Sequence, residues 1–457
     1  MYTPVTGFFM DKLLGRYHIN IALPLVLLFH LFLLIITKFT AWPEMLNWPH
    51  LMLAGYLPYR DIAIAHNPLM LIVLTLFFKF TGLGLWELQV FTWGVILLTD
   101  LLVYLVAEKV YSPKSAFIPL TLYVLLQVVY EGNGLWFDLF MVPIALLTYY
   151  FLRLRKPLLV GIFWALAFLT KQTALFFVLP IVVAFFLDKP NAKELKRFAL
   201  GVVATSVVFV FVLTTFGLLT DYFHWAVDFA LFRLPIAQGQ LHLPSFLQLV
   251  FYVLPFLHLL LIGKNKELLI ISLFSVAGIL SAFSRFELFH FQPGLPFLAI
   301  ASYGLLSNLP KKFKSLLTIF SLIIVLLVVK FATTNLGGDK VRFLDMRTQE
   351  LARYISDKTE PGEEIYILNL WENLYALTNT LPATKPVVPH LAWYMERSGV
   401  QEEIVSDLES TKPTFIFVGQ FIGGELAVYK PQKIYTYITS HYQVINIVNN
   451  MVVYKRS

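Results

Sequence analysis

Long apolar runs recur along almost the whole of this 457-residue chain, and they constrain its fold more than any other feature. A helix needs about 20 apolar residues to cross the hydrocarbon of a bilayer. Only 14% of the residues are charged, whereas soluble domains carry about 25%. We therefore expect a multi-pass α-helical membrane protein with about 11–13 helices, and soluble, disordered and fibrous classes are excluded. The runs lie near residues 18–39, 67–82, 86–107, 115–130, 135–152, 157–170, 172–187, 198–217, 244–262, 267–283, 291–308 and 313–332.

The charges between these runs indicate the topology. Lys and Arg favour the cytoplasmic ends of membrane helices, so the basic connections should share one side. The net charge of +7 then reflects topology, because a nucleic-acid binder would gather its cations on one soluble face. We expect the cytoplasmic membrane, with the loop 39–66 and the C-terminal tail outside. The basic connections are Lys109 with Lys114, residues 153–156, residues 189–197, Lys264 with Lys266, and Lys311 to Lys314.

One stretch conflicts with this topology. Two full crossings between residues 67 and 108 would put Lys109 on the wrong face. Either a segment near Gly82 and Gly84 is short or re-entrant, or the number of crossings differs from the number of apolar runs.

The tail has a different pattern from the rest. Residues 339–457 hold 12 Lys and Arg against 14 Asp and Glu. Runs rich in β-branched and aromatic residues predict strands at 364–368 and 414–418, and Asn449-Asn450 predicts a tight hairpin turn within 444–454. With helices expected at 342–358, 399–410 and 432–441, the tail should be a small α/β domain of residues 336–457. Residues 1–335 would form the membrane domain, whose loop 39–66 includes a helix at the membrane surface.

Ionisable side chains near a membrane are costly unless they are paired or solvated, so they mark candidate sites. Simpler structural roles stay open for each of them: a local Arg60–Asp61 salt bridge, an interfacial Lys171, an Arg285–Glu287 ion pair, a helix-capping Asp138 and hydrogen-bonded histidines. The chain has no cysteine, so disulfides and thiol chemistry are excluded, and it has no phosphate-loop, zincin or hydrolase-elbow motif. The candidates on the expected outer face are Glu44, Arg60, Asp61, His66, Asp138, Lys171, Arg285, Glu287 and His290.

Several motifs resemble the membrane-integral glycosyltransferases of the C-type fold that use polyprenyl-phosphate sugars, such as protein O-mannosyltransferases and aminoarabinose transferases. Members of that family have an acidic residue after the first helix, then a G-x-x-P-Y-x-D stretch and a His/Pro-Pro-Leu entry to the next helix. Here Glu44 precedes Gly55-Tyr-Leu-Pro-Tyr-Arg-Asp61 and His66-Asn-Pro-Leu69. Further similar stretches are Trp136-Phe-Asp138, Ala165-Leu-Ala-Phe-Leu-Thr-Lys171 and Ser284-Arg285-Phe-Glu287-Leu-Phe-His290. Pro43-Glu44 departs from the usual acidic element, so the base assignment is split between Glu44 and Asp61.

The resemblance implies an inverting transfer of a sugar from a polyprenyl-phosphate donor to an acceptor whose identity stays open. It implies catalytic roles for Glu44, Asp61 and Asp138. The donor phosphate would bind Lys171, Arg285 and Arg60, and the substrates would contact His66, His290 and Glu287.

No cofactor is required by the sequence. Oxygen and imidazole ligands for a divalent metal are present on the expected outer face, but no spacing specifies one. The bilayer and a lipid-linked sugar are the expected partners, and nucleic acid is not.

Two other functions stay open. The chain could be a flippase or exporter of lipid-linked sugars, although transporters tend to show internal repeats and binding groups at the middle of the membrane. It could also be an inactive scaffold of the same fold. Convergence of the charged residues on one outer cavity would favour the enzyme.

Overall fold

The computed structural model describes residues 21–237, 240, 243–245, 249, 252–253, 256, 259, 265–283, 285–308, 340–388, 392–395, 397–421 and 430–457. The helix expected at 313–332, most of the one expected at 244–262, and the expected domain boundary near 335 lie outside these residues.

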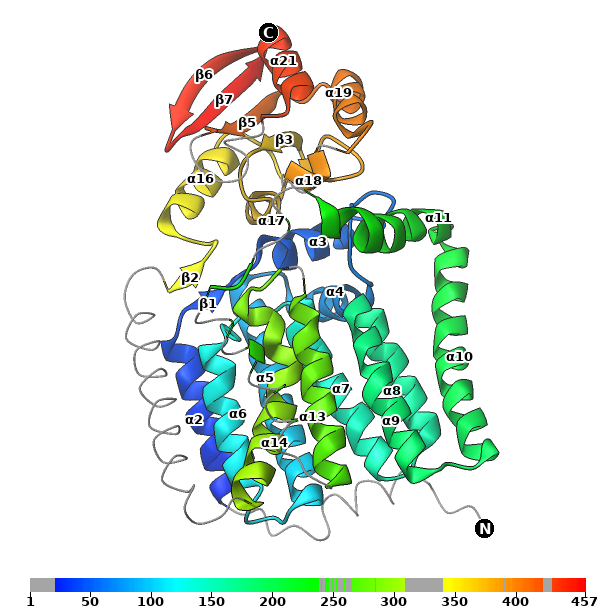
Figure 1. The fold of residues 1–457 in the computed structure, drawn as a ribbon. Helices are drawn as coiled ribbons and strands as arrows, with labels where there is room; N and C mark the ends of the chain where they lie inside the picture. The colour runs from blue at the N-terminus through cyan, green and yellow to red at the C-terminus, as the bar shows by residue number, and fades with distance from the viewer. Residues whose placement is uncertain are drawn as a thin grey trace, which may run out of the picture.

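A bundle of apolar helices forms one half of the molecule, and the tail lies at one end of it (Figure 1). In the described ranges, α5 and α10 are each long and apolar enough to cross a bilayer, and the other bundle helices are shorter. Their surface is apolar as well: Val207, Val208 and Phe211 on α10 are 59%, 63% and 69% exposed. The helices are α2 (Ala22–Ile36), α4 (Leu69–Thr81), α5 (Leu85–Val110), α6 (Phe117–Val129), α7 (Phe137–Arg153), α8 (Pro157–Thr170), α9 (Val178–Asp188), α10 (Ala192–Thr215), α13 (Lys266–Ile279) and α14 (Leu295–Asn308).

Helix α4 explains the topology conflict at residues 67–108. It has 13 residues, which is about 20 Å of helix against about 30 Å of hydrocarbon. It lies in the half of the bundle nearest the tail (Figure 1) and ends at Gly82, whose φ of 92° only glycine adopts readily. The expected short segment thus corresponds to α4, and α5, with 26 residues, is the described helix of this stretch that is long enough to cross a bilayer.

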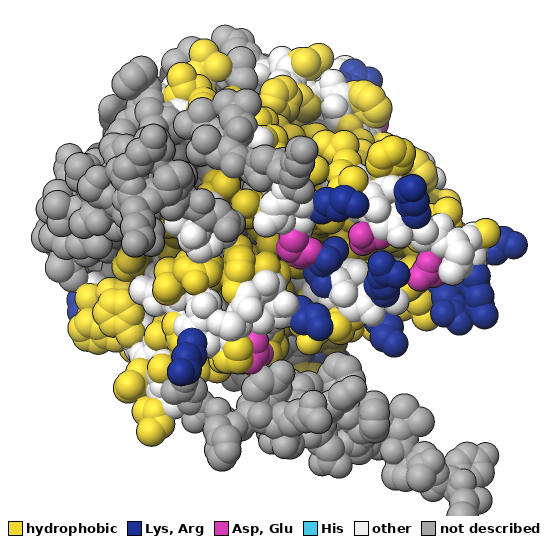
Figure 2. All heavy atoms as spheres, turned by 60° about the horizontal axis from the view of Figure 1, so that its bottom comes forward, with side chains coloured by type: hydrophobic (Ala, Val, Ile, Leu, Met, Phe, Trp, Pro, Cys, Tyr) yellow, Lys and Arg dark blue, Asp and Glu magenta, His cyan; other side chains and the backbone are white. Residues whose placement is uncertain are grey.

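The two ends of the bundle differ in charge. At the end away from the tail, Arg153 of α7 pairs with Asp188 of α9 at 3.6 Å and with Glu267 of α13. Figure 2 shows Lys and Arg outnumbering acidic side chains on this face. The described basic connections, including exposed Lys156 and Lys189, lie on it. The expected grouping of basic turns opposite the tail thus agrees with the structure.

The tail contains a five-stranded mixed sheet in the order β4-β3-β5-β7-β6. The predicted strands and the hairpin are confirmed, and Asn449 and Asn450 both take positive φ in its turn, as a tight hairpin requires. The strands are β3 (Glu364–Leu368), β4 (Leu381–Pro382), β5 (Phe415–Gly419), β6 (Tyr442–Val448) and β7 (Met451–Arg456); the helices are α16 (Met346–Ser356), α17 (Asn373–Thr378), α18 (Ala392–Met395), α19 (Val400–Thr411) and α21 (Gln432–His441).

The tail is bonded to the loop that follows the first helix. Strand β1 (Phe39–Thr40) pairs in parallel with β2 (Val341–Arg342). Helix α3 (Pro43–Leu53) lies between tail and bundle, where His50 Nε2 is 3.0 Å from the Thr380 carbonyl oxygen. A Cβ on Gly134 would lie 2.7 Å from the Thr40 carbonyl oxygen, so the turn before α7 also needs its glycine. These contacts fix the tail over the ends of α7, α8 and α14.

Candidate active site

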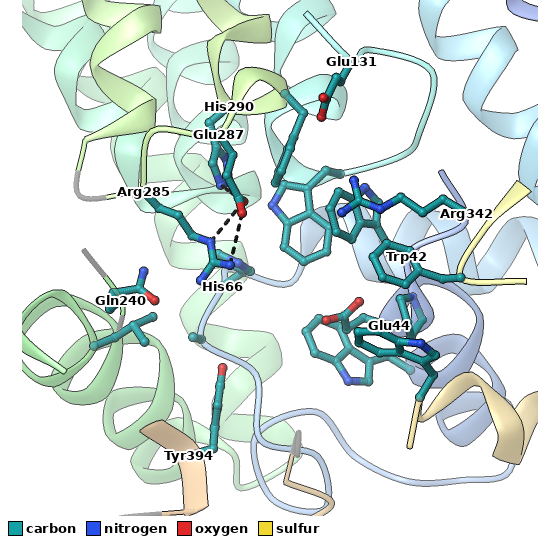
Figure 3. Close-up of a pocket in the computed structure, with 18 of the residues that line it drawn as sticks. Trp42, Glu44, His66, Glu131, Gln240, Arg285, Glu287, His290, Arg342 and Tyr394 are labelled. Carbon is teal, nitrogen blue, oxygen red and sulfur yellow. Dashed lines mark hydrogen bonds and ion pairs between the residues drawn. The ribbon is translucent and has the colours of Figure 1, made fainter. Parts of the chain in front are cut away.

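A cavity of about 1000 Å³ separates the tail from these helix ends. Its walls come from α3, the loop before α4, the turn before α7, the break after α8, the segment before α14 and the start of the tail (Figure 3). Six of the nine candidate residues line it: Glu44, His66, Lys171, Arg285, Glu287 and His290.

Lys171, Asp138 and His290 form a buried cluster on one wall. Lys171 takes an extended backbone conformation between α8 and the 3₁₀ helix η1 (Gln172–Phe177), which breaks the apolar helix at this point. Asp138 Oδ2 accepts from Lys171 Nζ at 2.6 Å and from His290 Nδ1 at 2.6 Å. Asp138 is fully buried and does not line the cavity, whereas Lys171 and His290 do. Asp138 therefore holds the two cavity-lining donors in place and does not itself face the cavity.

Arg285 and Glu287 form an ion pair on the same wall, next to the 3₁₀ helix η5 (Leu288–Gly294). The contacts are bidentate: Arg285 Nε lies 3.0 Å from Glu287 Oε2, and Nη2 donates to Oε1 at 3.1 Å. Glu287 Oε2 also lies 3.8 Å from His290 Nε2. Because a planar guanidinium and a carboxylate fit each other in two places, this pair fixes the direction of the Arg285 side chain.

Glu44 lies in the first turn of α3, on the tail side of the cavity. Burial raises the pKa of its carboxyl group to about 7, and the positive charge of Arg285 partly offsets this rise. Its Oε2 atom has no hydrogen-bond partner in the part of the chain that the structure describes. A carboxyl group with this pKa, facing a cavity, has the strength of a general base near neutral pH.

His66 contributes a neutral ring to the cavity. Its ring centroid lies 4.2 Å from that of Phe137 and 5.8 Å from that of Trp136. Burial and the positive charge of Lys171 lower its pKa to about 3. His66 is therefore uncharged at neutral pH and can only bind substrate as a neutral donor or acceptor.

Arg60 and Asp61 do not line the cavity, contrary to their expected roles. Asp61 Oδ2 accepts from the Leu57 amide at 2.7 Å and so closes a local turn. Arg60 points the other way, with Nε 3.2 Å from Asp221 Oδ2. The positive φ of Tyr59, 71°, reverses the chain just before them. The geometry thus leaves Glu44 as the cavity carboxylate of this loop, and the alternative of a local Arg60–Asp61 salt bridge is also wrong.

Several cavity residues were missed by the sequence reasoning. Arg342 enters through the β1–β2 pairing, and its guanidinium carbon lies 4.9 Å from the Phe343 ring centroid. Nothing in the local sequence marks it. Glu131 lies in a polar, glycine-rich turn on the expected outer face, which was a usable signal. Glu372, at the start of α17, lies near Glu44 but does not line the cavity, and burial and the charge of Glu44 raise its pKa.

Most of the possible metal ligands in and beside the cavity are engaged with other side chains. Among the described residues, no group of three or more His, Asp or Glu side chains is placed to hold a metal ion. Asp138 is taken up by Lys171 and His290, and Glu287 by Arg285.

Comparisons with known proteins agree with this architecture. Residues 65–216, about a third of the chain, match the family model described as dolichyl-phosphate-mannose-protein mannosyltransferase. Among curated proteins, none matches. ArnT from Cupriavidus metallidurans in the apo state is similar with a TM-score of 0.63 at 14% identity, over 95% of this chain and 96% of that chain. The chain has the C-type glycosyltransferase fold.

Two further structures show the same fold. ArnT from C. metallidurans bound to undecaprenyl phosphate gives a TM-score of 0.65 at 14% identity, over 95% of this chain and 97% of that chain. The Archaeoglobus fulgidus oligosaccharyltransferase in the apo form gives 0.51 at 11% identity, over 95% and 74%. The expected fold class, and the resemblance drawn from the motifs, are thus confirmed. Because the C-type fold is a multi-pass membrane fold, the apolar bundle is its membrane part.

Proposed function

We propose that this protein is a glycosyltransferase that moves a sugar from a polyprenyl-phosphate donor to an acceptor at the outer face of the cytoplasmic membrane, with inversion at the sugar carbon. One observation carries the proposal: Lys171, Arg285 and Glu44, which are far apart in sequence, line one cavity at the end of the bundle. The similarity of the fold to a protein solved with undecaprenyl phosphate supports the class of donor.

The cations would bind the donor phosphate. Asp138 and Glu287 each hold one of them, Lys171 and Arg285, toward the cavity. The leaving phosphate gains negative charge as its bond to the sugar breaks, so cations held in advance stabilise the transition state more than the ground state. In such a site Lys acts as a point charge and Arg as a directional donor.

Glu44 would act as the base. As the acceptor oxygen forms its bond to the anomeric carbon, its proton passes to Glu44. The sugar–phosphate bond breaks in the same step, and its electron pair stays on the phosphate. Attack opposite the leaving group inverts the anomeric centre, and atoms and charges balance without a further reactant.

The rate of transfer should depend on the ionisation of Glu44. The base form exists above its pKa of about 7, so the rate should rise through this pH and level off above it. Below it the rate should fall about tenfold per pH unit. The profile would be measured with mannosyl undecaprenyl phosphate as the donor. A profile that is flat from pH 5 to pH 8 would contradict the assignment.

Replacing Arg285 with alanine should weaken binding of undecaprenyl phosphate about tenfold, because a phosphate loses a charged donor. Binding would be followed by native mass spectrometry of the protein in nanodiscs. Arg60→Ala is the matched control, since Arg60 pairs with Asp221 away from the cavity. Equal weakening in both variants would count against a phosphate site at Arg285.

The orientation follows from the same proposal. We place the basic end of the bundle in the cytoplasm and the tail, residues 336–457, outside as a separate domain. A transporter would be expected to hold its substrate near the middle of the membrane, whereas the candidate residues here lie at one end of the bundle. Measurable sugar transfer by the wild-type protein would support an enzyme, and the absence of transfer would support an inactive scaffold.

A further inference from the structure

Glu131 lies in an unusual backbone conformation at the edge of the cavity. Its φ is 52°, a left-handed value that costs a residue with a side chain more than it costs glycine. The side chain is exposed and lines the cavity. In Figure 3, Glu131 lies above the cavity and Glu44 below, with Glu287 on the left and Arg342 on the right. A glycine at this position would relax the backbone. The presence of a glutamate therefore needs a reason other than stability of the fold.

The turn that carries Glu131 is held from both sides by buried amides. Gln127 Nε2 donates to the Gly132 carbonyl at 2.9 Å, and Gln292 Nε2 donates to the Tyr130 carbonyl at 2.9 Å. A Cβ on Gly132 would collide with the Gln127 side chain. The backbone on each side of Glu131 is therefore fixed by side chains of α6 and η5.

The Gln127 amide is itself held by a hydrogen-bonded pair inside the bundle. His30 Nε2 lies 3.0 Å from Gln127 Oε1, and His30 Nδ1 lies 2.7 Å from Asp100 Oδ2. Both His30 and Asp100 are fully buried. Ionisable groups at this depth are expensive to keep, and the sugar-transfer step described above does not use them.

A second set of contacts fixes the other end of the same turn. Asn133 Oδ1 accepts from Trp93 Nε1 at 3.1 Å, and Asn133 Nδ2 donates to the Leu34 carbonyl at 2.8 Å. The Asn133 carbonyl accepts from the Thr40 amide at 2.8 Å. Side chains from α5, α6 and η5, with backbone from α2 and the loop after it, thus converge on one five-residue turn, and Glu131 is the residue of that turn that enters the cavity with a charge.

We propose that Glu131 contacts the transferred sugar, accepting hydrogen bonds from its hydroxyl or amino groups, and that the buried His30–Asp100–Gln127 chain serves to hold it there. This inference rests on the proposed function, since it needs a donor whose phosphate lies at Lys171 and Arg285. Glu131, Lys171 and Arg285 line one cavity, and Glu287 holds Arg285 in it. A sugar attached to a phosphate at Lys171 and Arg285 would therefore occupy the cavity that Glu131 lines.

The charges around this position favour one class of sugar. Glu131, Glu287 and Glu44 line the same cavity as Lys171, Arg285 and Arg342. The proposed function assigns Lys171 and Arg285 to the donor phosphate, and the Arg342 guanidinium lies over the Trp42 and Phe343 rings. A free carboxylate can accept from two neighbouring hydroxyls or from an ammonium group. An acidic sugar would bring another carboxylate against them. The transferred sugar is therefore neutral or amino, and a uronic acid is disfavoured.

The test measures binding of three lipids to the full chain in nanodiscs: undecaprenyl phosphate, its mannosyl form and its glucuronosyl form. The wild-type protein should prefer the mannosyl lipid over the glucuronosyl lipid by at least about tenfold. In Glu131→Gln and Glu131→Gly this ratio should fall about tenfold, because the charge that accepts hydroxyls and repels carboxylates is gone. Affinity for undecaprenyl phosphate itself should stay within about twofold in both variants.

Thermal stability separates this role from a structural one. Glu131→Gly should melt at the same temperature as the wild type or higher, because glycine relieves the left-handed backbone. Lys189→Gly is the matched control: Lys189 has a φ of 47° at the far end of the bundle, and its variant should gain stability without any change in lipid preference.

The outcomes distinguish this inference from the proposed function. A wild-type protein that binds both sugar lipids equally, or a ratio that stays unchanged in both Glu131 variants, overturns the role of Glu131. Failure of the wild type to bind undecaprenyl phosphate at all would instead overturn the proposed donor.

Discussion

Replacing Glu44 with glutamine is expected to lower the rate of sugar transfer by about 10²–10⁴-fold, the usual contribution of a general base. Glutamine has nearly the same size and keeps a hydrogen-bonding side chain, but it cannot take a proton from the acceptor. The affinity for undecaprenyl phosphate should stay within about twofold, because Lys171 and Arg285 are unchanged. Transfer would be followed by mass spectrometry as loss of the sugar from the copurified lipid donor, with membranes of the native host supplying the acceptor.

Asp61→Asn is the control variant for Glu44→Gln, because Asp61 is the other carboxylate that the motifs suggest as the base. Asp61 accepts from the Leu57 amide and does not line the cavity, and asparagine can keep that hydrogen bond. Its transfer rate should therefore remain within about threefold of the wild type. If Asp61→Asn abolished transfer and Glu44→Gln did not, the base would have to be reassigned to Asp61.

Replacing Lys171 with methionine should affect both stability and donor binding. Asp138 would remain fully buried, and the one side-chain partner that the structure still shows for it would be His290, whose pKa is lowered by burial. Breaking a buried ion pair from one side lowers the free energy of unfolding by about 3–5 kcal/mol. Binding of undecaprenyl phosphate should weaken by at least about tenfold, since the site loses a point charge. Thermal unfolding and native mass spectrometry in nanodiscs would measure the two effects.

The double variant Lys171→Met/Asp138→Asn separates these two roles. Removing both charges leaves no buried ion unpaired, so most of the lost stability should return. Donor binding should stay weak, because the cation is still missing. Recovery of lipid binding together with stability would mean that Lys171 only supports the fold.

The fold of the tail could largely be predicted from its sequence. Strands β3 and β5 and the β6–β7 hairpin follow from β-branched runs and from Asn449-Asn450, which are local signals. The number of bundle crossings is harder to predict, because a run of 13 residues such as α4 has the composition of a membrane helix without its length. Its place in the half of the bundle nearest the tail is visible only in the structure (Figure 1).

The sequence could predict which residues are candidates for the site, but not which of them lie together in the structure. Unexpected charges in apolar surroundings pointed to Lys171, Asp138 and His290, and the structure brings all three into contact. Arg60 and Asp61 carried the same signal, yet the reversal of the chain at Tyr59 turns them away. Arg342 carried no signal, because it reaches the cavity through a strand pair that joins residues about 300 positions apart in the chain.

The sequence alone determined the membrane class, the grouping of the basic turns and the inventory of ionisable groups, because burial costs act on each residue separately. The tertiary structure alone decided which of these groups share a cavity and which carboxylate has a pKa near neutrality. Those properties depend on distances between side chains from remote segments and on the water that packing excludes, and neither is encoded in any local stretch of the chain.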